Sequence, residues 1–180
     1  MTKGKIVSFV GLFALMGCHI VFAENRPGVV TVSVADGYYH FAEKHKMQNT
    51  SIPNVSLAYN FTDHWAIEGT VGLLNTNTSS TNIQPNVSEH GYLYTAAGLY
   101  RFCPYWQFQP YVSAGIGVLG LKPNGTDSQH QGNLNVGVGT QWLVHKTIAF
   151  RAEARDIYTM TGGKNDYMIS LGMSFLFCAC

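Results

Sequence analysis

The chain has 180 residues, with 11 lysines and arginines, 10 aspartates and glutamates and a formal net charge of +1. This balance lacks the basic surface that nucleic-acid-binding proteins use, so the sequence predicts no nucleic-acid partner. Only 12% of the residues are charged, whereas 19 are glycine and 20 are tyrosine or phenylalanine. Such a mixture is typical of a strand protein whose outer surface meets lipid and whose interior holds small side chains.

The N-terminus has the order of a secretory signal peptide. Two lysines precede an apolar run over residues 6–16, and Val21-Phe22-Ala23 stands before Glu24. The run is shorter than the roughly 20 residues that a membrane-spanning helix needs. We therefore predict a signal peptide over residues 1–23, cleaved after Ala23, and a single domain over residues 24–180.

A second interpretation of this segment stays open. Leu15-Met16-Gly17-Cys18 resembles a lipoprotein cleavage box, which would make Cys18 a lipidated first residue. The mostly apolar stretch from His19 to Ala23, which leads directly into the cleavage site, favours the ordinary signal peptide.

Eight segments of the remaining chain alternate between apolar residues and small or polar ones. A strand with this period presents one apolar face and one polar face, as a barrel with lipid outside and water inside requires. In the second segment Leu57 and Tyr59 are expected to face lipid, and Ser56, Ala58 and Asn60 the lumen. The predicted strands cover residues 29–41, 54–61, 65–74, 91–102, 108–121, 131–144, 147–158 and 167–177.

The predicted connections alternate in length. Those at 62–64, 103–107 and 145–146 are short, and the others, at 42–53, 75–90, 122–130 and 159–166, are longer and polar. Outer-membrane barrels have short periplasmic turns and longer external loops. The fold class is therefore all-β: an eight-stranded, antiparallel, up-and-down transmembrane β-barrel in the bacterial outer membrane, with a narrow lumen filled by side chains.

Aromatic residues gather beside the short turns. Rings of this kind suit a membrane interface because they have an apolar body and a polar handle. The expected inner girdle consists of Trp65, Tyr105, Trp106, Phe108 and Trp142.

Several motifs resemble those of the OmpA-type outer-membrane barrel domain family. Residues 57–68 read Leu-Ala-Tyr-Asn-Phe-Thr-Asp-His-Trp-Ala-Ile-Glu, similar to the second hairpin of that family, and further matches are Pro110-Tyr111, Gly115-x-Gly117 and 151–155. The last strand, with Phe175 and Phe177, resembles the signal read by the barrel assembly machinery. The resemblance implies a barrel-only member without a peptidoglycan-binding domain, whose loops serve adhesion, immune-evasion or envelope roles.

Five charged residues are expected inside the barrel. Strand parity places four of them on lumenal faces, and Arg101 is expected with them. A charge in that interior must be paired. We expect a structural ladder that plugs the lumen, with a gate or proton path as the alternative and Asp36 as a further candidate acid. The expected network is Glu68, Arg101, Arg151, Glu153 and Arg155.

No catalytic or metal site is predicted. A lipid A deacylase would need a serine and a histidine close together on a late strand facing lipid, but Ser170 and Ser174 have no histidine beside them. His145 falls in a short turn, and the seven histidines lack metal-ligand spacing. We expect no cofactor and no enzymatic activity.

Two further sets of residues carry weaker expectations. Lys44 and Lys46 lie in the first long loop, where lipopolysaccharide phosphates would meet them, although a solvated polar loop is an equal alternative. Cys103, Cys178 and Cys180 all fall at the periplasmic end of the predicted barrel, where a disulfide from Cys103 to the tail and free or intermolecular thiols are both open.

The sequence thus predicts a structural and surface-interaction protein, a barrel that anchors four external loops. A narrow, low-conductance diffusion channel is the alternative, and a lipid-modifying barrel enzyme is a third. The expected partners are outer-membrane lipid and lipopolysaccharide, the barrel assembly machinery and a host or surface ligand.

Overall fold

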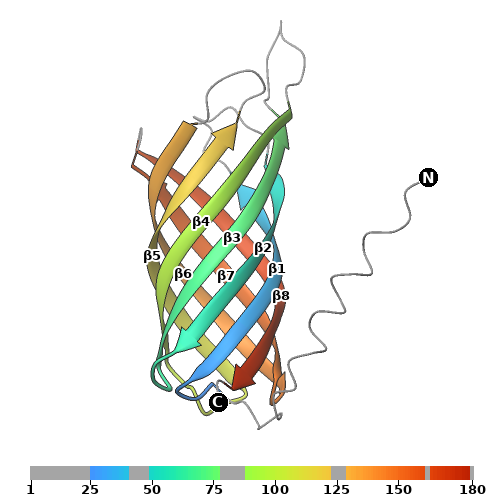
Figure 1. Ribbon diagram of the computed structural model, residues 1–180, viewed down its shortest axis with the longest axis vertical. Helices are drawn as coiled ribbons and strands as arrows, with labels where there is room; N and C mark the ends of the chain where they lie inside the picture. The colour runs from blue at the N-terminus through green and yellow to red at the C-terminus, as the bar shows by residue number, and fades with distance from the viewer. Residues whose placement is uncertain (1–24, 41–48, 78–87, 123–128, 161–162, 179–180) are drawn as a thin grey trace, which may run out of the picture.

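The computed structural model describes residues 25–40, 49–77, 88–122, 129–160 and 163–178, which form one barrel (Figure 1). No helix in these ranges is long and apolar enough to cross a membrane. The strands are β1 (Val29–His40), β2 (Thr50–Asn60), β3 (Trp65–Asn77), β4 (Ser88–Arg101), β5 (Phe108–Lys122), β6 (Gln129–His145), β7 (Ile148–Thr159) and β8 (Lys164–Cys178).

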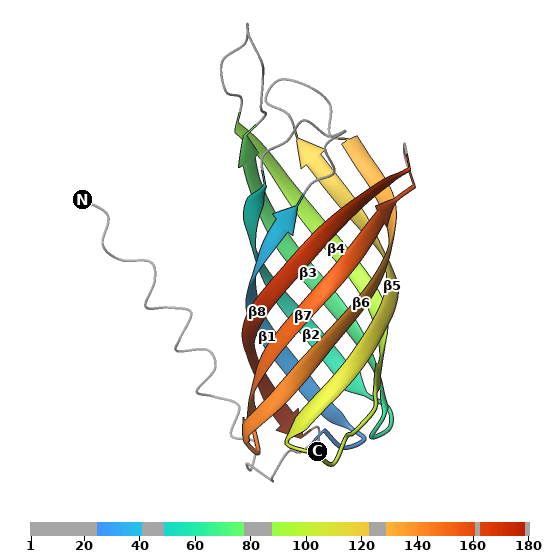
Figure 2. The ribbon, with the colours of Figure 1, turned by 180° about the vertical axis from the view of Figure 1, so that it is seen from behind.

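The sheet is closed. Each strand pairs with the next in an antiparallel arrangement. β8 also pairs with β1, and the register runs from the pair Val29–Cys178 to the pair His40–Tyr167. Figure 2 shows β8 and β1 side by side. Closure leaves no strand edge unpaired. The predicted eight-stranded antiparallel fold is confirmed.

The strands extend beyond their predicted ends, chiefly where long loops were expected. β2 begins at Thr50 rather than 54, β3 ends at Asn77 rather than 74, and β8 begins at Lys164 rather than 167. These end segments are rich in Asn, Ser and Thr and lack the apolar period, yet pairing across strands satisfies their backbone groups, as for Asn75 with His90.

One predicted connection length is therefore wrong. The β7–β8 connection covers only residues 160–163, so it is shorter than the β4–β5 turn over 102–107 at the opposite end. The other three connections at that end cover residues 41–49, 78–87 and 123–128, and most of these residues lie outside the described ranges.

The predicted facing of the strands is confirmed. Leu57 is 58% exposed and Val138 61%, whereas their neighbours Ala58 and Gly137 are buried inside. The outer surface of the barrel is thus apolar, which suits lipid and not water. The side chains of the expected inner girdle are likewise exposed, from Trp142 at 50% to Tyr105 at 77%.

The lumen contains apolar layers as well as polar ones. At the end of the long connections the buried apolar residues include Tyr39, Leu93 and Ile157, and at the opposite end a smaller cluster contains Val29, Ala149 and Leu176. A third cluster, between the first and the turns, contains Leu99 and Tyr111. An eight-stranded barrel is narrow enough for such side chains to meet across it.

The orientation of the barrel can be tested by labelling whole cells. With the native cysteines replaced by serine, a cysteine at position 80 should react with a membrane-impermeant maleimide, and a cysteine at position 63 should react only after the outer membrane is opened, because short turns face the periplasm. Reaction at position 63 in intact cells, with position 80 protected, would invert the assignment.

The lumenal apolar layer should contribute to stability. Ile157→Ala should lower the free energy of unfolding by about 2–4 kcal/mol because it leaves a cavity among packed side chains. Ile169→Ala is the matched control, since Ile169 is 61% exposed and its removal leaves no cavity. Urea unfolding in lipid vesicles measures both changes, and equal losses would show that the lumen is loosely packed.

Candidate functional site

The charged residues of the lumen form the candidate site. Glu68 comes from β3, and Arg151, Glu153 and Arg155 come from β7, where alternate residues share the inner face. These four residues are called the ladder below. Because β3 and β7 lie on opposite sides of the closed sheet, the ladder crosses the lumen.

The ladder is joined by charge-assisted hydrogen bonds. Arg151 binds Glu68 through both terminal nitrogens, one of them at 2.9 Å from Oε1, and its Nη2 lies 2.8 Å from Glu153 Oε2. Arg155 Nη2 lies 2.8 Å from Glu153 Oε1 and 3.5 Å from Glu68 Oε1. Each carboxylate therefore meets two guanidinium groups, an arrangement that offsets the cost of desolvating the four charges.

A tyrosine holds one side of this ladder. Arg151 Nε donates a hydrogen bond to Tyr111 Oη at 2.7 Å, and the guanidinium carbon of Arg151 lies 5.1 Å from the centre of the Tyr111 ring. Ser113 donates to Glu153 Oε1 at 3.1 Å, and Arg155 Nη1 donates to Thr95 at 3.1 Å. The ladder is thus fixed by hydroxyl groups from β4 and β5.

Arg101 lies in the lumen but outside the ladder. It is 2% exposed, and its Nη1 donates to Asn60 Oδ1 at 3.0 Å, while its Nε has no hydrogen-bond partner among the described residues. The expectation that Asp36 would supply a further acid is wrong. Asp36 has the parity of the outward residue Val34, is exposed, and accepts a hydrogen bond from Ser51 at 2.6 Å.

A residue that strand reasoning missed closes the end with the short turns. Asn25, which precedes β1, is 2% exposed and donates to Gln109 and, at 3.1 Å, to Gln141. Asn60 donates to Asn25 Oδ1 at 3.3 Å. Gly28, with a φ of 83°, lets the chain turn from this position into β1. Alternation along their strands places Gln109 and Gln141 on the lumenal face, but Asn25 precedes the first alternating segment, so this pattern could not identify it.

A second missed pair lies at the opposite end. Tyr39 donates to Asp166 Oδ2 at 3.0 Å, and both side chains are fully buried. Asp166 fell in a predicted loop, so its lumenal position could not be inferred. A cavity beside the ladder measures about 10 Å³, roughly the least that holds one water molecule.

The serines considered for catalysis face the wrong way for a lipid substrate. Ser170 and Ser174 are buried in the lumen, and Ser174 Oγ lies 2.8 Å from Ser33 Oγ. His145, predicted in a turn, is the last residue of β6; it is exposed, and its Nδ1 lies 3.2 Å from Thr147 Oγ1. Within the described ranges no group of histidine, cysteine and acidic side chains could hold a metal ion.

Hydrogen bonds connect neighbouring turns at the end of the barrel with the short turns. Tyr105 donates to Asp63 Oδ2 at 2.9 Å, and this bond raises the pKa of the Tyr105 hydroxyl. His64 Nδ1 lies 2.8 Å from the carbonyl oxygen of Arg101. These contacts join the β2–β3 turn to the β4–β5 turn and to the end of β4.

Several predicted residues are not tested by this geometry. Lys44, Lys46, Cys18 and Cys180 lie outside the described residues, as does the side chain of Cys178. Cys103 is half-buried and unpaired among the described residues. The lipopolysaccharide contact and the disulfide therefore stay predictions.

The fold is similar to solved outer-membrane barrels. The N-terminal barrel domain of Pseudomonas aeruginosa OprF matches with a TM-score of 0.64 and 19% identity, over 84% of this chain and 98% of that one. Neisserial surface protein A (NspA) gives 0.60 and 16%, over 83% and 96%. Ail, the attachment invasion locus protein of Yersinia pestis, in complex with the heparin analogue sucrose octasulfate, gives 0.53 and 16%, over 84% and 99%.

No curated protein matches the chain. The family comparison, in contrast, covers nearly all of it, since residues 9–177 match the outer membrane protein beta-barrel domain. With its closed eight-stranded sheet, apolar outer surface and paired lumenal charges, the chain belongs to the outer membrane protein beta-barrel family, whose place is the bacterial outer membrane.

Proposed function

We propose that the protein is a structural and surface-interaction protein of the outer membrane, in which a sealed barrel anchors four external loops. The observation that carries this proposal is the filled lumen. From one end to the other, Asn25 with its glutamine partners, the ladder around Glu68 and Glu153, and the apolar layer around Ile157 occupy it in turn. A barrel closed at three levels is suited to hold loops and not to pass solutes.

The loops are the part left for recognition. Three of the four external connections include the polar stretches 41–49, 78–87 and 123–128, and the fourth is the short segment 160–163. Similar barrels include a surface protein of Neisseria and Ail, an attachment protein solved with a heparin analogue. We infer an adhesion, immune or envelope role, with a host or surface ligand as partner and no enzymatic activity.

The same proposal covers export and assembly. Residues 1–23 serve as the signal peptide, residues 24–180 form the barrel domain, and the barrel assembly machinery inserts it. Lipopolysaccharide surrounds the external end, where Lys44 and Lys46 meet its phosphates. The five lumenal charges act as a structural plug.

Loop replacement tests the surface role. Replacing residues 78–87 with a Gly-Ser segment of equal length should reduce adhesion of the producing cells to host cells, or their survival in serum, while barrel yield and heat-modifiable gel migration stay unchanged. Replacing the turn residues 146–147 in the same way is the control. If replacing each of the four external connections in turn leaves both phenotypes intact, the surface role is wrong.

The ladder should be structural. Glu153→Gln leaves two guanidinium groups competing for one carboxylate, and we expect a loss of about 3–5 kcal/mol in the free energy of unfolding. Adding Arg155→Met should restore part of that loss. Asp36→Asn, an acid of the outer face, should change stability by less than about 1 kcal/mol.

Conductance separates the plug from the channel. Planar bilayers containing the native barrel should show no steady single-channel current, because side chains fill the lumen. A steady native current, raised by Glu153→Gln with stability unchanged, would mean that the charges line a wet pore, and the diffusion channel would replace the structural proposal.

A further inference from the structure

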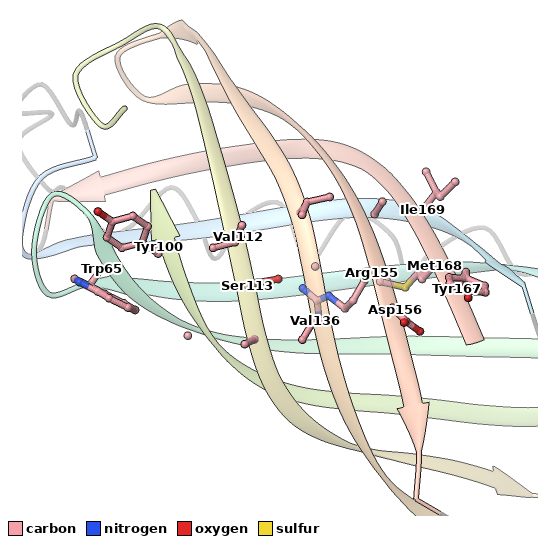
Figure 3. Close-up of a pocket in the computed structure, with 15 residues that line it drawn as sticks. Trp65, Tyr100, Val112, Ser113, Val136, Arg155, Asp156, Tyr167, Met168 and Ile169 are labelled. Carbon is pink, nitrogen blue, oxygen red and sulfur yellow. The ribbon is translucent and has the colours of Figure 1, made fainter. Parts of the chain in front are cut away.

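The lipid-facing wall of the barrel contains a groove of about 800 Å³ (Figure 3). Its outward lining residues belong to two neighbouring rows that cross the strands. In the first row, Gly98, Ala114, Val136, Asp156 and Tyr167 are successive register partners from β4 to β8. The second row contains Trp65, Tyr100, Val112, Val138, Ala154 and Ile169.

The groove lies where small outward residues of neighbouring strands stand beside bulky ones. Gly98, Ala114 and Ala154 are its small outward lining residues, and we take them as its floor. The bulky residues Tyr94, Ile116 and Leu171, which lie elsewhere on the outer face, are 49–67% exposed. Small side chains at these positions let an apolar partner approach the backbone closely.

The groove runs obliquely across the membrane. The first row makes four strand-to-strand steps of about 4.8 Å, roughly 19 Å in all. Because barrel strands tilt by about 40°, such a row climbs by about 12 Å, close to the thickness of one leaflet. It rises from the short-turn end, where Trp65 and Tyr100 lie, toward the external end, where Figure 3 shows Asp156 and Tyr167.

A carboxylate stands at the external end of this apolar groove. Asp156 belongs to the outer face of β7 and is half-buried, and its Oδ1 atom is buried without a hydrogen-bond partner among the described residues. An unpaired carboxylate oxygen in an apolar setting costs free energy unless a donor reaches it. The other carboxylate oxygen, Oδ2, is accessible and also lacks a hydrogen-bond partner among the described residues, so the groove offers an acceptor next to a path for a hydrocarbon chain.

We propose that the groove holds one acyl chain of an outer-leaflet lipid that carries an amide N–H or a hydroxyl near its carbonyl, which is the chemistry of the lipid A part of lipopolysaccharide. The chain lies over Gly98, Ala114 and Ala154, and its donor binds Asp156 Oδ2, the carboxylate oxygen that the protein does not enclose. This gives lipopolysaccharide a site on the barrel wall, separate from Lys44 and Lys46. The proposal rests on the membrane location of the barrel and not on the surface role of its loops.

The shape favours a lipid over a second copy of the chain. A symmetric dimer through this face would place groove against groove, and two concave surfaces leave a void between them. A flexible chain fills a single groove and carries its own donor to the depth of Asp156.

Native mass spectrometry of the purified, folded barrel tests the proposal, with purified lipid A as the probe and phosphatidylcholine, which has no N–H or O–H donor, as the comparison. Native protein should retain lipid A about tenfold better than phosphatidylcholine, as expected for a charge-assisted hydrogen bond. Asp156→Leu should remove this preference, and Asp156→Asn, which keeps an acceptor oxygen, should reduce it.

Filling the groove should reduce the retention of both lipids by the protein. Ala114→Leu should lower retention of lipid A about tenfold by occupying the floor. Ala96→Leu is the matched control, because Ala96 is an exposed alanine of the same wall that does not line the groove. Heat-modifiable gel migration verifies that every variant is folded.

Three results would overturn the proposal. One is that native protein retains lipid A and phosphatidylcholine equally well, and that Asp156→Leu does the same. Another is a loss of lipid A that follows Lys44→Ala and Lys46→Ala but neither groove variant, which would assign binding to the headgroup alone. The last is a native dimer that Ala114→Leu dissociates, which would make this face an interface between copies.

Discussion

Closure of the sheet is the constraint on which the rest of the structure depends. In the hydrocarbon core no water is present to satisfy backbone N–H and C=O groups, so a strand protein must leave no edge. Pairing of β1 with β8 from Val29 to His40 meets this requirement. With eight strands the closed sheet encloses a narrow space, and every inward side chain must fit within it.

The composition of the lumen follows from that narrow space. The two carboxylates and two guanidinium groups of the ladder are removed from bulk water there, and they are tolerable only because Glu68 and Glu153 each meet two arginines and hydroxyl groups accept hydrogen bonds from remaining donors of Arg151 and Arg155. Apolar layers on either side of the ladder reduce the access of water, which strengthens these interactions. The barrel thus has a polar centre, apolar lumenal layers and an apolar exterior.

Parity explains how much of this arrangement the sequence could predict. Within a strand each residue two positions from a known lumenal one is also lumenal, so Glu153 and Arg155 follow from Arg151, and the lipid-facing residues follow equally well. The same rule excludes Asp36, which shares its parity with the exposed Val34. The Asp36 prediction relied on closeness to the strand end instead of parity.

Residues outside the apolar period were beyond this reasoning. Above the hydrocarbon region both faces of a strand meet water, so polar stretches such as Asn75-Thr76-Asn77 extend β3 without any alternation to mark them. Asp166 belongs to such an extension of β8, which places its side chain in the lumen. Asn25 is held by three side-chain contacts from distant strands, which only the closed sheet brings together.

The two outward carboxylates show what parity implies for the membrane surface. Asp36 and Asp156 both face away from the lumen in the half of their strands toward the long connections, away from the midplane, where an acid on the lipid face costs most. Asp36 accepts a hydrogen bond from the hydroxyl of Ser51 on the neighbouring strand. The neighbours of Asp156 in register are Val136 and Tyr167, and no described residue donates a hydrogen bond to its carboxylate. The outer wall of this barrel is therefore not a uniform apolar surface, since Asp156 places a carboxylate without a hydrogen-bond partner among the described residues on it.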